Sequence, residues 1–319
     1  MWFIQIHWNR GLIALLFFGS CSIKPSQTLE PAGPEKTSSF KISNEDLTAV
    51  FVDNSAIPPT HGAGYNGLAS LGHRLDDSVL FVPRYAGFNL EHIFGGDSLA
   101  ELFEPRRHPM TLYKKNDAEV MLYQSPTPIS GVESLTSFKL VPPHYIDITF
   151  LCILRNKSFF RHGYAGLFWA SYINAPEDKK IYFISADDLS SPERWISTYS
   201  ETHGVRSTHL HRKDNHKLFF AKNFNASLAS HFSVFRFENP FYYGLSREMV
   251  FAQLFDAKEI IRFSQSPTGG GPANPAWDFQ YIIPKPKTGK IYSFKARLIY
   301  KPFVSAEDIR SEYVKWKAD

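Results

Sequence analysis

The sequence predicts an all-β body that ends in one short helix. Its apolar residues occur in short runs that alternate with polar residues or are rich in β-branched and aromatic side chains, and Gly, Pro, Asn or Asp bound most of these runs. Aromatic residues make up 15% of the 319-residue chain, which suits the pleated, half-buried surface of strands. A helical period is evident only near the C-terminus. Together these observations favour a large β-sandwich or barrel.

Taken in order, fifteen segments have the pattern of strands. They cover residues 47–52, 67–71, 78–82, 110–113, 119–124, 132–140, 145–155, 166–173, 180–184, 218–221, 232–237, 249–255, 260–265, 277–283 and 291–300. Ser305 and Asp308 have the spacing of a capping box, which predicts a helix over 306–316. Helical turns are predicted at 98–102 and 191–196. No composition break or fixed-period repeat divides the body, so we predict one domain over 41–319.

The first 21 residues resemble the signal peptide of a bacterial lipoprotein. Arg10 supplies a positive charge, residues 11–19 form an apolar run too short to span a bilayer, and small residues precede Cys21. The resemblance implies removal of residues 1–20 and lipidation of Cys21 in a periplasmic or outer-membrane lipoprotein. The alternatives are an ordinary cleaved signal peptide or a retained anchor. Residues 21–40 hold three prolines and few large apolar side chains, which predicts a flexible tether and membrane contact through the lipid alone.

Charge and cysteine content argue against several classes of function. The formal net charge is +4, or +3 without Arg10, and Lys and Arg are scattered, so we expect no nucleic-acid partner. Cys152 is the one Cys left in the mature body, and its apolar neighbours predict a buried side chain without a disulfide. The sequence lacks dinucleotide-binding and phosphate-binding glycine motifs and the His-Glu-x-x-His zinc motif, and we predict no cofactor.

Three stretches carry a resemblance to a known fold. GYNGLASLGHRLDDSVLFVPRYAG, VESLTSFKLVPPHYIDITFLCILRN and TGKIYSFKARLIYKP follow the order of an early strand with an "-SL-" segment, a central hairpin ending in "-RN-" and a late "-G-x-x-Y/F-" strand. This order resembles the galactose-mutarotase-like β-supersandwich over residues 47–300. Alternation and turn residues alone are also compatible with a jelly roll.

The resemblance implies sugar binding on a concave sheet face. Members of the family include aldose and sugar-phosphate epimerases, polysaccharide lyases and some glycosidases, and the epimerases use a His as acid and a Glu as base. The central strand that should carry this His reads GLFWASYI here, and Trp277-Asp278 stands where the Glu is expected. These departures argue against plain mutarotase activity, and fold likeness alone gives little information about the reaction.

The densest polar cluster lies in VPRYAGFNLEHIFGGD. Carboxylate and guanidinium groups bind hydroxyls, and aromatic faces cover the apolar side of a sugar ring. We therefore predict substrate contacts from Arg84, Tyr85 and Asn89, and acid–base roles for Glu91 and His92. The alternative is a structural loop in which Arg84 pairs with Glu91 or Asp97.

A second candidate is the glycine- and proline-rich loop at residues 264–280. Three consecutive glycines permit close backbone approach, and Trp277, Asp278 and Gln280 offer a stacking platform with hydrogen-bonding groups. The alternative is an ordered connection with Trp277 as a core anchor. We expect this loop to meet the 84–92 loop at one mouth of the sandwich, with the Trp277 ring partly exposed.

Several histidines are further candidates. His203, beside a glycine and an arginine, is predicted to be catalytic, and His61 is predicted to bind substrate, with an exposed loop position as its alternative. His209 and His211 would share a strand face, but a metal site is the weaker interpretation because the spacing of structural zinc sites is missing. The group EPRRH at 104–108 could clamp an anion, although a solvated turn is favoured.

These features leave three functional hypotheses open. The first is an exported enzyme that processes a sugar or polysaccharide as an epimerase, lyase or hydrolase. The second is a glycan-binding surface lipoprotein without catalytic activity. The third is a structural envelope lipoprotein.

Overall fold

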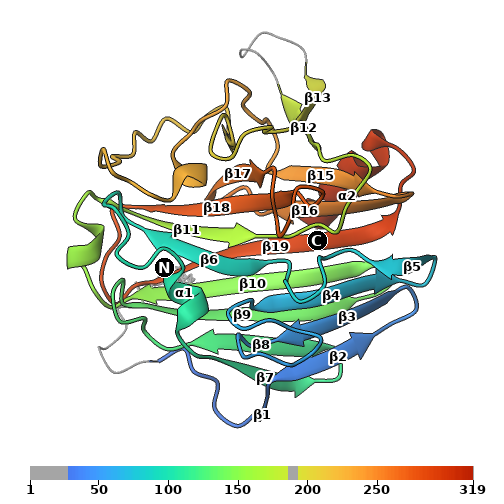
Figure 1. Cartoon of the computed structure of the whole chain (residues 1–319), viewed down its shortest axis with the longest axis horizontal. Coiled ribbons are helices and arrows are strands. Elements are labelled where there is room, and N and C mark those ends of the chain that lie inside the picture. The colour runs from blue at the N-terminus through green and yellow to red at the C-terminus, as the bar shows by residue number, and fades with distance from the viewer. Residues whose placement is uncertain (1–27, 186–192, 319) are drawn as a thin grey trace, which may run out of the picture.

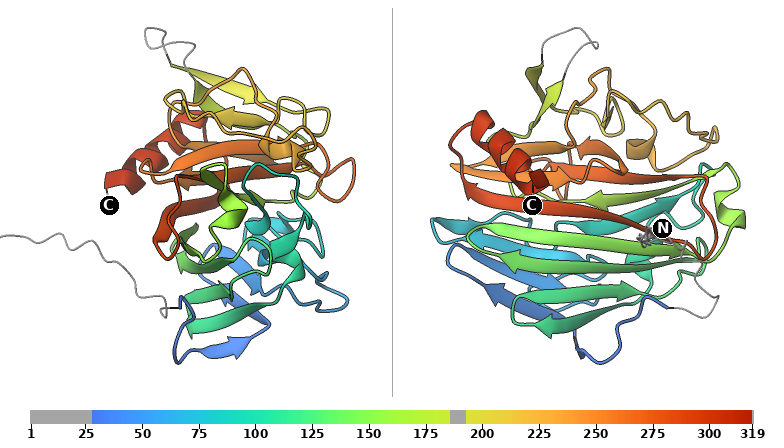
Figure 2. Two further views of the ribbon diagram at one scale, coloured as in Figure 1. Left: turned by 90° about the vertical axis from the view of Figure 1, so that its left-hand side faces the viewer. Right: turned by 180° about the vertical axis from the view of Figure 1, so that it is seen from behind.

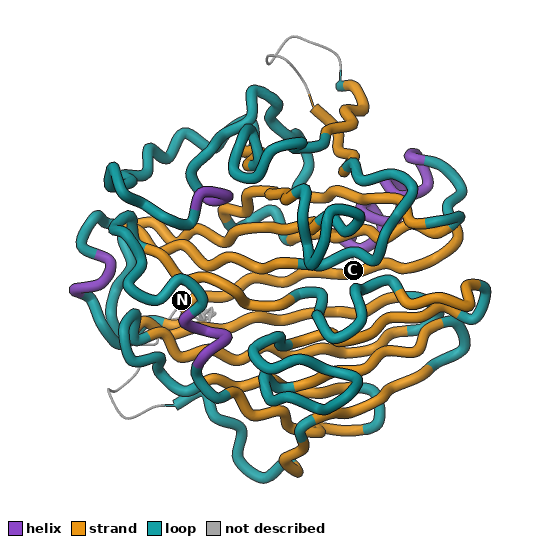
Figure 3. The backbone as a smooth tube through the Cα atoms, in the orientation of Figure 1, coloured by secondary structure: helices purple, strands orange, loops and turns teal. Residues whose placement is uncertain are grey.

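The computed structural model describes residues 28–185 and 193–318. The predicted signal peptide, Cys21 and the first part of the predicted tether lie outside these residues. Strands form nearly half of the described residues, and helix is confined to short turns and the C-terminal segment (Figure 3). All neighbouring strands within the sheets pair antiparallel.

The largest sheet has ten strands. In spatial order they are β1 (Glu35–Thr37), β7 (Met110–Asn116), β8 (Glu119–Gln124), β9 (Val132–Val141), β10 (Tyr145–Leu154), β19 (Ile291–Pro302), β16 (Met249–Phe255), β15 (Phe241–Ser246), β12 (Ile181–Ser185) and β13 (Arg194–Thr198).

Two smaller sheets form the opposite layer (Figure 1). One has the order β14 (Thr208–Leu210), β17 (Ile260–Ser266), β18 (Ala276–Pro284), β11 (Tyr164–Ala170) and β6 (Asn89–Phe94), and the other has the order β2 (Ser39–Ser43), β3 (Leu47–Val52), β4 (Gly67–His73) and β5 (Asp76–Val79). They lie side by side because β4 contacts β6 and Leu68 forms a bridge with Gly87.

The main core fills the space between these layers. Phe150 and Phe294 of the ten-stranded sheet pack on Trp169, which stacks on Phe279 of β18 at 4.9 Å between ring centroids. On the other half, Phe51 of β3 packs on Phe138 of β9 at 5.1 Å. Such aromatic pairs add to the free energy gained from burying apolar area. The layers are thus held together along their whole width.

Four short helical elements complete the fold. They are α1 (Glu104–Arg107), the 3-10 turns Ser158–Phe160 and Ser227–Ala229, and α2 (Ala306–Ala318). The backbone N–H of Asp308 donates to Ser305 Oγ, as the capping pattern predicts. Ile309 and Tyr313 of α2 pack on the outer face of the ten-stranded sheet, at the back of the molecule (Figure 2). Among the described residues, no helix is long and apolar enough to cross a membrane.

The fold prediction is confirmed in class and in most strands, and Cys152 is buried. Four local predictions are wrong. Residues 218–221 and 232–237 form no strand, because they run over the five-stranded sheet with only isolated bridges at Phe232 and Phe237. The predicted helical turn at 191–196 overlaps β13, which pairs with β12, and the turn predicted at 98–102 gives way to α1 at 104–107.

The tether prediction is wrong for the described residues before 40. β1 pairs with β7, and Leu29 packs against Tyr113 and Tyr123. The side chain of Thr28 and the backbone N–H of Leu29 both donate to Glu133 Oε1, at 2.5 and 2.7 Å. A buried carboxylate on β9 therefore recruits this proline-containing segment to the sheet, which composition alone did not indicate.

Candidate functional site

A β-bulge on β6 sets the geometry of the candidate site. Phe168 pairs with His92 and Trp169 pairs with Leu90, so Glu91 is the extra residue on β6. Leu90 and Ile93 both belong to the main core, which leaves Glu91 and His92 together on the outer face of the five-stranded sheet. Without the bulge, two adjacent residues would point to opposite faces. The bulge makes the Glu–His pair possible.

Glu91 and His92 face each other through their side chains. His92 Nδ1 lies 2.6 Å from the carbonyl oxygen of Leu102, which can only accept, so Nδ1 carries a hydrogen. His92 Nε2 lies 3.3 Å from Glu91 Oε1. The two side chains thus form a buried ionisable pair, in which 10% of the Glu91 surface and 7% of the His92 surface is exposed.

Tyr172 completes the environment of Glu91. Its hydroxyl donates to Glu91 Oε2 at 2.5 Å. Burial raises the pKa of Glu91, but His92, Tyr172 and the charge of Arg106 more than offset this and lower the pKa below its usual range. Glu91 is therefore ionised at neutral pH.

The pKa of Asp278 is shifted in the opposite direction from that of Glu91. It lies on β18 in the same layer, is 1% exposed, and accepts a hydrogen bond from the backbone N–H of Ser171 at 3.1 Å. Burial and the charge of Glu91 raise its pKa well above the usual range. Two carboxyl groups whose pKa values move apart are a common arrangement in acid–base sites, because one is held as an acid and the other as a base.

His203 approaches this pair from the segment that follows β13. It is exposed, and its Nδ1 lies 3.5 Å from Ser227 Oγ. Partial burial lowers the pKa of His203, while the charge of Glu91 raises it and that of His92 lowers it. The structure thus brings the three predicted catalytic residues into one electrostatic neighbourhood.

Three tyrosines form a wall beside the pair. Tyr65 packs edge-on against Tyr85 at 4.3 Å and Tyr172 at 5.5 Å between ring centroids, and Tyr85 lies 5.3 Å from Tyr172. The guanidinium of Arg106 lies 4.0 Å from the Tyr65 ring centroid. Aromatic faces with a cation above them bind ligands that have both apolar and charged surface.

The two predicted loops meet at this wall. A Cβ on Gly270 would lie 2.3 Å from Tyr85 Cε2, and one on Gly269 would lie 2.9 Å from Tyr172 Cδ1. Gly270 has φ +97°, so the glycine is required both by the backbone and by the approach of the ring. The two segments therefore converge as predicted, although residues 89–92 and 276–280 belong to strands β6 and β18. The shared-site hypothesis also required a partly exposed Trp277 ring, and this part is wrong.

Trp277 is a correction. Its ring is 0% exposed, its Nε1 donates to the carbonyl oxygen of Lys179 at 3.2 Å, and Gly244 leaves the space that it fills. Along β18, Trp277 alternates with Asp278, so the same pleat that turns Asp278 outward turns Trp277 into the core. The stacking-platform hypothesis therefore fails, and the core-anchor alternative holds.

Asn89 and Gln280 are also buried in structural roles. Asn89 Oδ1 accepts from the backbone N–H and the side chain of Asn66, at 3.0 and 2.8 Å, which ties β6 to the start of β4. Gln280 Nε2 donates to Ser264 Oγ and Thr208 Oγ1, beneath the covering segment 227–229. Neither side chain is exposed, so the predicted substrate contacts from both are wrong for this conformation.

Arg84 and His61 lie together but outside the Glu91 neighbourhood. They line a separate cavity of about 460 Å³ on the outer face of β3 and β4. His61 is buried, and its Nε2 donates to the carbonyl oxygen of Tyr65 at 2.8 Å. The alternative pairing of Arg84 also fails, because Asp97 pairs with Arg161 and Glu91 with His92.

The other predicted histidine pair is separated. His209 is fully buried on β14 beside Gln265, and His211 donates to the carbonyl oxygen of Glu238. No group of three or more His, Cys, Asp or Glu residues in the described part of the chain is arranged to hold a metal ion.

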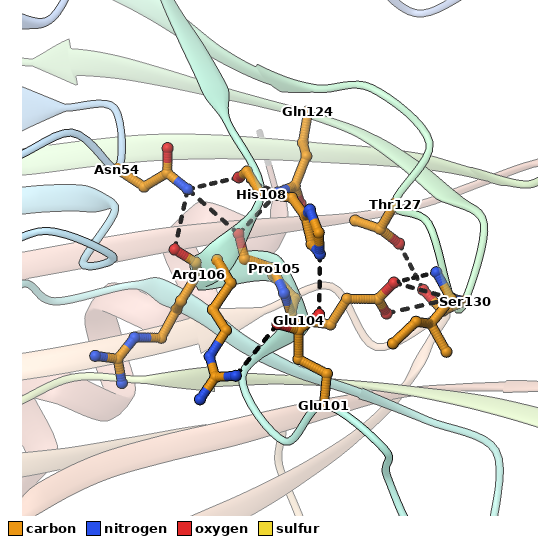
Figure 4. A network of polar contacts seen from close by, with 11 residues as sticks. Asn54, Glu101, Glu104, Pro105, Arg106, His108, Gln124, Thr127 and Ser130 are labelled. Carbon is orange, nitrogen blue, oxygen red and sulfur yellow. Dashed lines mark hydrogen bonds and ion pairs between the residues drawn. The ribbon is translucent and has the colours of Figure 1, made fainter.

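Arg106 belongs to the EPRRH group, for which the sequence favoured a solvated turn over an anion clamp. The interpretation of 104–108 as a solvated turn is wrong, because Glu104 is 2% exposed and accepts from the backbone N–H groups of Ile129 and Ser130, at 2.7 and 3.0 Å. Asn54 Nδ2 donates to the carbonyl oxygens of this turn, including that of His108 at 2.6 Å (Figure 4). The network fixes α1 and aims Arg106 away from Glu104 (Figure 4).

Comparison with known proteins places the fold. No protein-family model and no curated protein sequence matches the chain. A GalM/aldose epimerase homologue from C. elegans has a similar structure, with a TM-score of 0.50 and 8% identity over 85% of this chain and 100% of that one. A putative aldose 1-epimerase from Escherichia coli K12 has a TM-score of 0.49 and 9% identity over 84% and 100% of the two chains.

A heparan sulfate lyase from Pedobacter heparinus is also similar, with a TM-score of 0.40 and 9% identity over 84% of this chain and 35% of that one. The likeness to the C. elegans homologue shows that the fold is galactose-mutarotase-like, as the sequence resemblance implied. At these identities the likeness concerns the fold alone.

Proposed function

We propose that the chain is an exported carbohydrate-active protein that carries out acid–base chemistry on a sugar or polysaccharide. The observation that carries this proposal is the Glu91–His92 pair, an ionised carboxylate 3.3 Å from an imidazole nitrogen, with the exposed His203 in the same electrostatic neighbourhood. The fold supports the ligand class, because the C. elegans homologue of similar structure is named as an aldose epimerase homologue.

In the proposed mechanism, His203 takes a proton from the substrate on the open side of the site. Its lowered pKa keeps it neutral at pH 7 and therefore able to accept a proton. The Glu91–His92 pair donates a second proton to the substrate from the side of the sheet. One proton thus leaves the substrate and one enters it. Tyr172 holds Glu91 in place, and the tyrosine wall covers the sugar ring.

The test is an assay of residues 28–319 on reducing sugars and polysaccharides, with anomeric exchange followed by NMR and chain cleavage by product analysis. Glu91→Gln and His203→Gln should each lower kcat/KM by about 10²- to 10⁴-fold. Matched controls are Glu45→Gln and His216→Gln, which lie outside the site. In the wild type, kcat/KM should increase with pH through an apparent pKa below 6.5. Equal activity of all five proteins would contradict the proposal.

A glycan-binding protein without catalytic activity is the second candidate, favoured by the low exposure of Glu91 and His92. A glycan array separates the possibilities. Binding with no product from any bound glycan would support this second function, and no binding at all would leave a structural envelope protein.

Lipid anchoring at Cys21 and a periplasmic or outer-membrane location are part of the same proposal. They rest on residues 1–21, whose apolar run and Gly-Ser-Cys junction resemble a lipoprotein signal.

A further inference from the structure

The cavity beside α1 is lined by two arginines. It has a volume of about 560 Å³, and its lining includes Arg106, Arg107, Asn54 and Ser55 but no carboxylate. Arg107 has a partner in Glu101 at 3.4 Å. Arg106 forms no ion pair within 4.0 Å among residues 28–185 and 193–318, and its Nε is buried without a hydrogen-bond partner there.

Arg106 is also held in place before any ligand arrives. Its guanidinium lies 4.0 Å from the Tyr65 ring centroid and 4.8 Å from that of Phe103. The turn that carries it is fixed by Glu104 and Asn54 (Figure 4). A planar cation stacked on aromatic rings loses little entropy when it binds a planar oxyanion, which makes it suited to carboxylate or sulfate.

This cavity adjoins the Glu91–His92 pair. The Phe103 ring lines the cavity and lies 5.0 Å from the His92 ring. Tyr65 connects Arg106 to Tyr172, which donates to Glu91. A sugar unit at Glu91 and a charged group at Arg106 would therefore occupy neighbouring positions on one ligand.

We propose that this cavity is the subsite for a carboxylate or sulfate group, and that the substrate is an acidic glycan. The inference rests on the proposed function and narrows its substrate class. Arg106 is its main specificity-determining residue, and Arg107 contributes less because Glu101 already balances part of its charge.

The test measures affinity of the full-length protein in detergent by calorimetry. The probes are oligosaccharides of polygalacturonate, hyaluronan and heparin, each paired with its carboxyl-reduced form, and for heparin also with its desulfated form. We expect at least one acidic oligosaccharide to bind more than about tenfold more tightly than its neutral partner, with the difference shrinking at high salt. The carboxyl-reduced and desulfated heparin forms identify which oxyanion is recognised.

Arg106→Gln should remove this discrimination, so that the affinities for the acidic oligosaccharide and its neutral partner differ by less than about twofold. Arg106→Lys keeps the positive charge but lacks the planar guanidinium, so it should retain part of the discrimination between acidic and neutral oligosaccharides. This variant also provides the test if Arg106→Gln folds poorly. Arg310→Gln on α2 is the control for net charge and should change nothing.

Equal wild-type affinity for acidic and neutral partners would overturn the inference and leave the proposed function intact. Discrimination that survives in Arg106→Gln would overturn it as well. If no glycan binds, the proposed function and the inference both fall.

Discussion

At the scale of single residues, the site depends on how burial and charge divide protons among neighbouring groups. Glu91 and Asp278 are both carboxyl groups in the same layer, yet the pKa of Glu91 is lowered and that of Asp278 is raised. The difference lies in their partners. Glu91 has a histidine, a tyrosine and a nearby arginine, whereas Asp278 has a backbone N–H and the negative charge of Glu91. The native protein therefore keeps a proton on Asp278 to higher pH than an exposed carboxyl group would.

This proton makes a prediction for Asp278→Asn. A group with a raised native pKa contributes stability that is fully present below its unfolded pKa of about 3.9 and is lost as the pH rises. The asparagine side chain does not titrate, so the variant does not lose stability in this way as the pH rises. Its free energy of unfolding relative to wild type should therefore increase between pH 4 and 8, by up to about 1.4 kcal/mol per pH unit. Denaturant unfolding at several pH values provides the measurement.

The opposite pH dependence of Glu91 is present in both proteins and cancels in the comparison. Exposed Asp77→Asn is the control and should show no such trend. A constant difference between Asp278→Asn and wild type from pH 4 to 8 would mean that Asp278 is ionised in the native state.

At the scale of elements, three local devices determine which side chains lie on the outer face of the sheet beside the candidate site. The bulge at Glu91 turns two adjacent residues of β6 to one face, and the regular alternation of β18 turns Trp277 inward and Asp278 outward. A third device is α1, a single turn whose buried Glu104 positions Arg106. Each device follows from backbone geometry, and each would be disrupted by one inserted or deleted residue.

The C-terminal helix α2 is fastened by a polar contact that should be sensitive to acid. Glu312 accepts from Lys301 Nζ at 2.5 Å and from the Tyr145 hydroxyl at 2.9 Å, with His144 nearby. The interaction with His144 makes the largest contribution to lowering the pKa of Glu312, followed by the hydrogen bonds with Lys301 and Tyr145. Together they outweigh the effect of burial and lower this pKa to about 2. The helix therefore docks on a carboxylate that stays ionised in mild acid.

Glu312→Gln should destabilise the protein by about 1–3 kcal/mol at pH 7, because buried charged partners lose a hydrogen-bond acceptor. A lowered native pKa contributes stability above about pH 4.5 that is lost as the pH falls through about 2, so the difference should vanish near pH 2. Thermal unfolding of both proteins across this range tests it. Glu307→Gln, an exposed residue of the same helix, should cost less than about 1 kcal/mol. A loss that is independent of pH would exclude the charge of Glu312 as its cause.

At the scale of the whole molecule, two layers of sheet leave one face for a site and the other for α2 (Figure 2). The segment between β14 and β15 covers part of the site face. Phe220 and Phe224 of that segment pack on Phe94 of β6, at 6.4 and 5.9 Å between ring centroids. The end of this face that carries Glu91, His92 and the tyrosine wall is where a ligand would bind.

Membrane attachment also belongs to this scale. We expect a fatty-acid probe to label the protein in a bacterial host with lipoprotein processing, and Cys21→Ala to abolish the label. Cys152→Ala is the matched control and should keep it, because Cys152 is fully buried. Labelled Cys21→Ala would refute lipidation at this position.

The sequence by itself determined the all-β class, most strands, the capped helix and the fold resemblance. These follow from local patterns of alternation, turn residues and caps, which act over a few residues. The pairing of Glu91 with His92 could also be predicted, because both residues stand side by side in one polar cluster. Trp277, Phe279 and Tyr281 alternate with polar Asp278 and Gln280, and this strand pattern indicates a buried Trp277 ring. The glycine- and proline-rich segment before Trp277 suggested a loop instead.

Only the tertiary structure decided which groups meet. Tyr172, Arg106 and His203 reach the Glu91 neighbourhood from segments far apart in the chain, and no local pattern encodes that meeting. The bulge at Glu91 exists only relative to its partner strand β11. Burial of Glu104 likewise depends on the backbone N–H groups of a distant turn, and so a segment rich in charge became a fixed support for Arg106 instead of a solvated turn. Burial and partners set the charge state of each group, and both are properties of the folded chain.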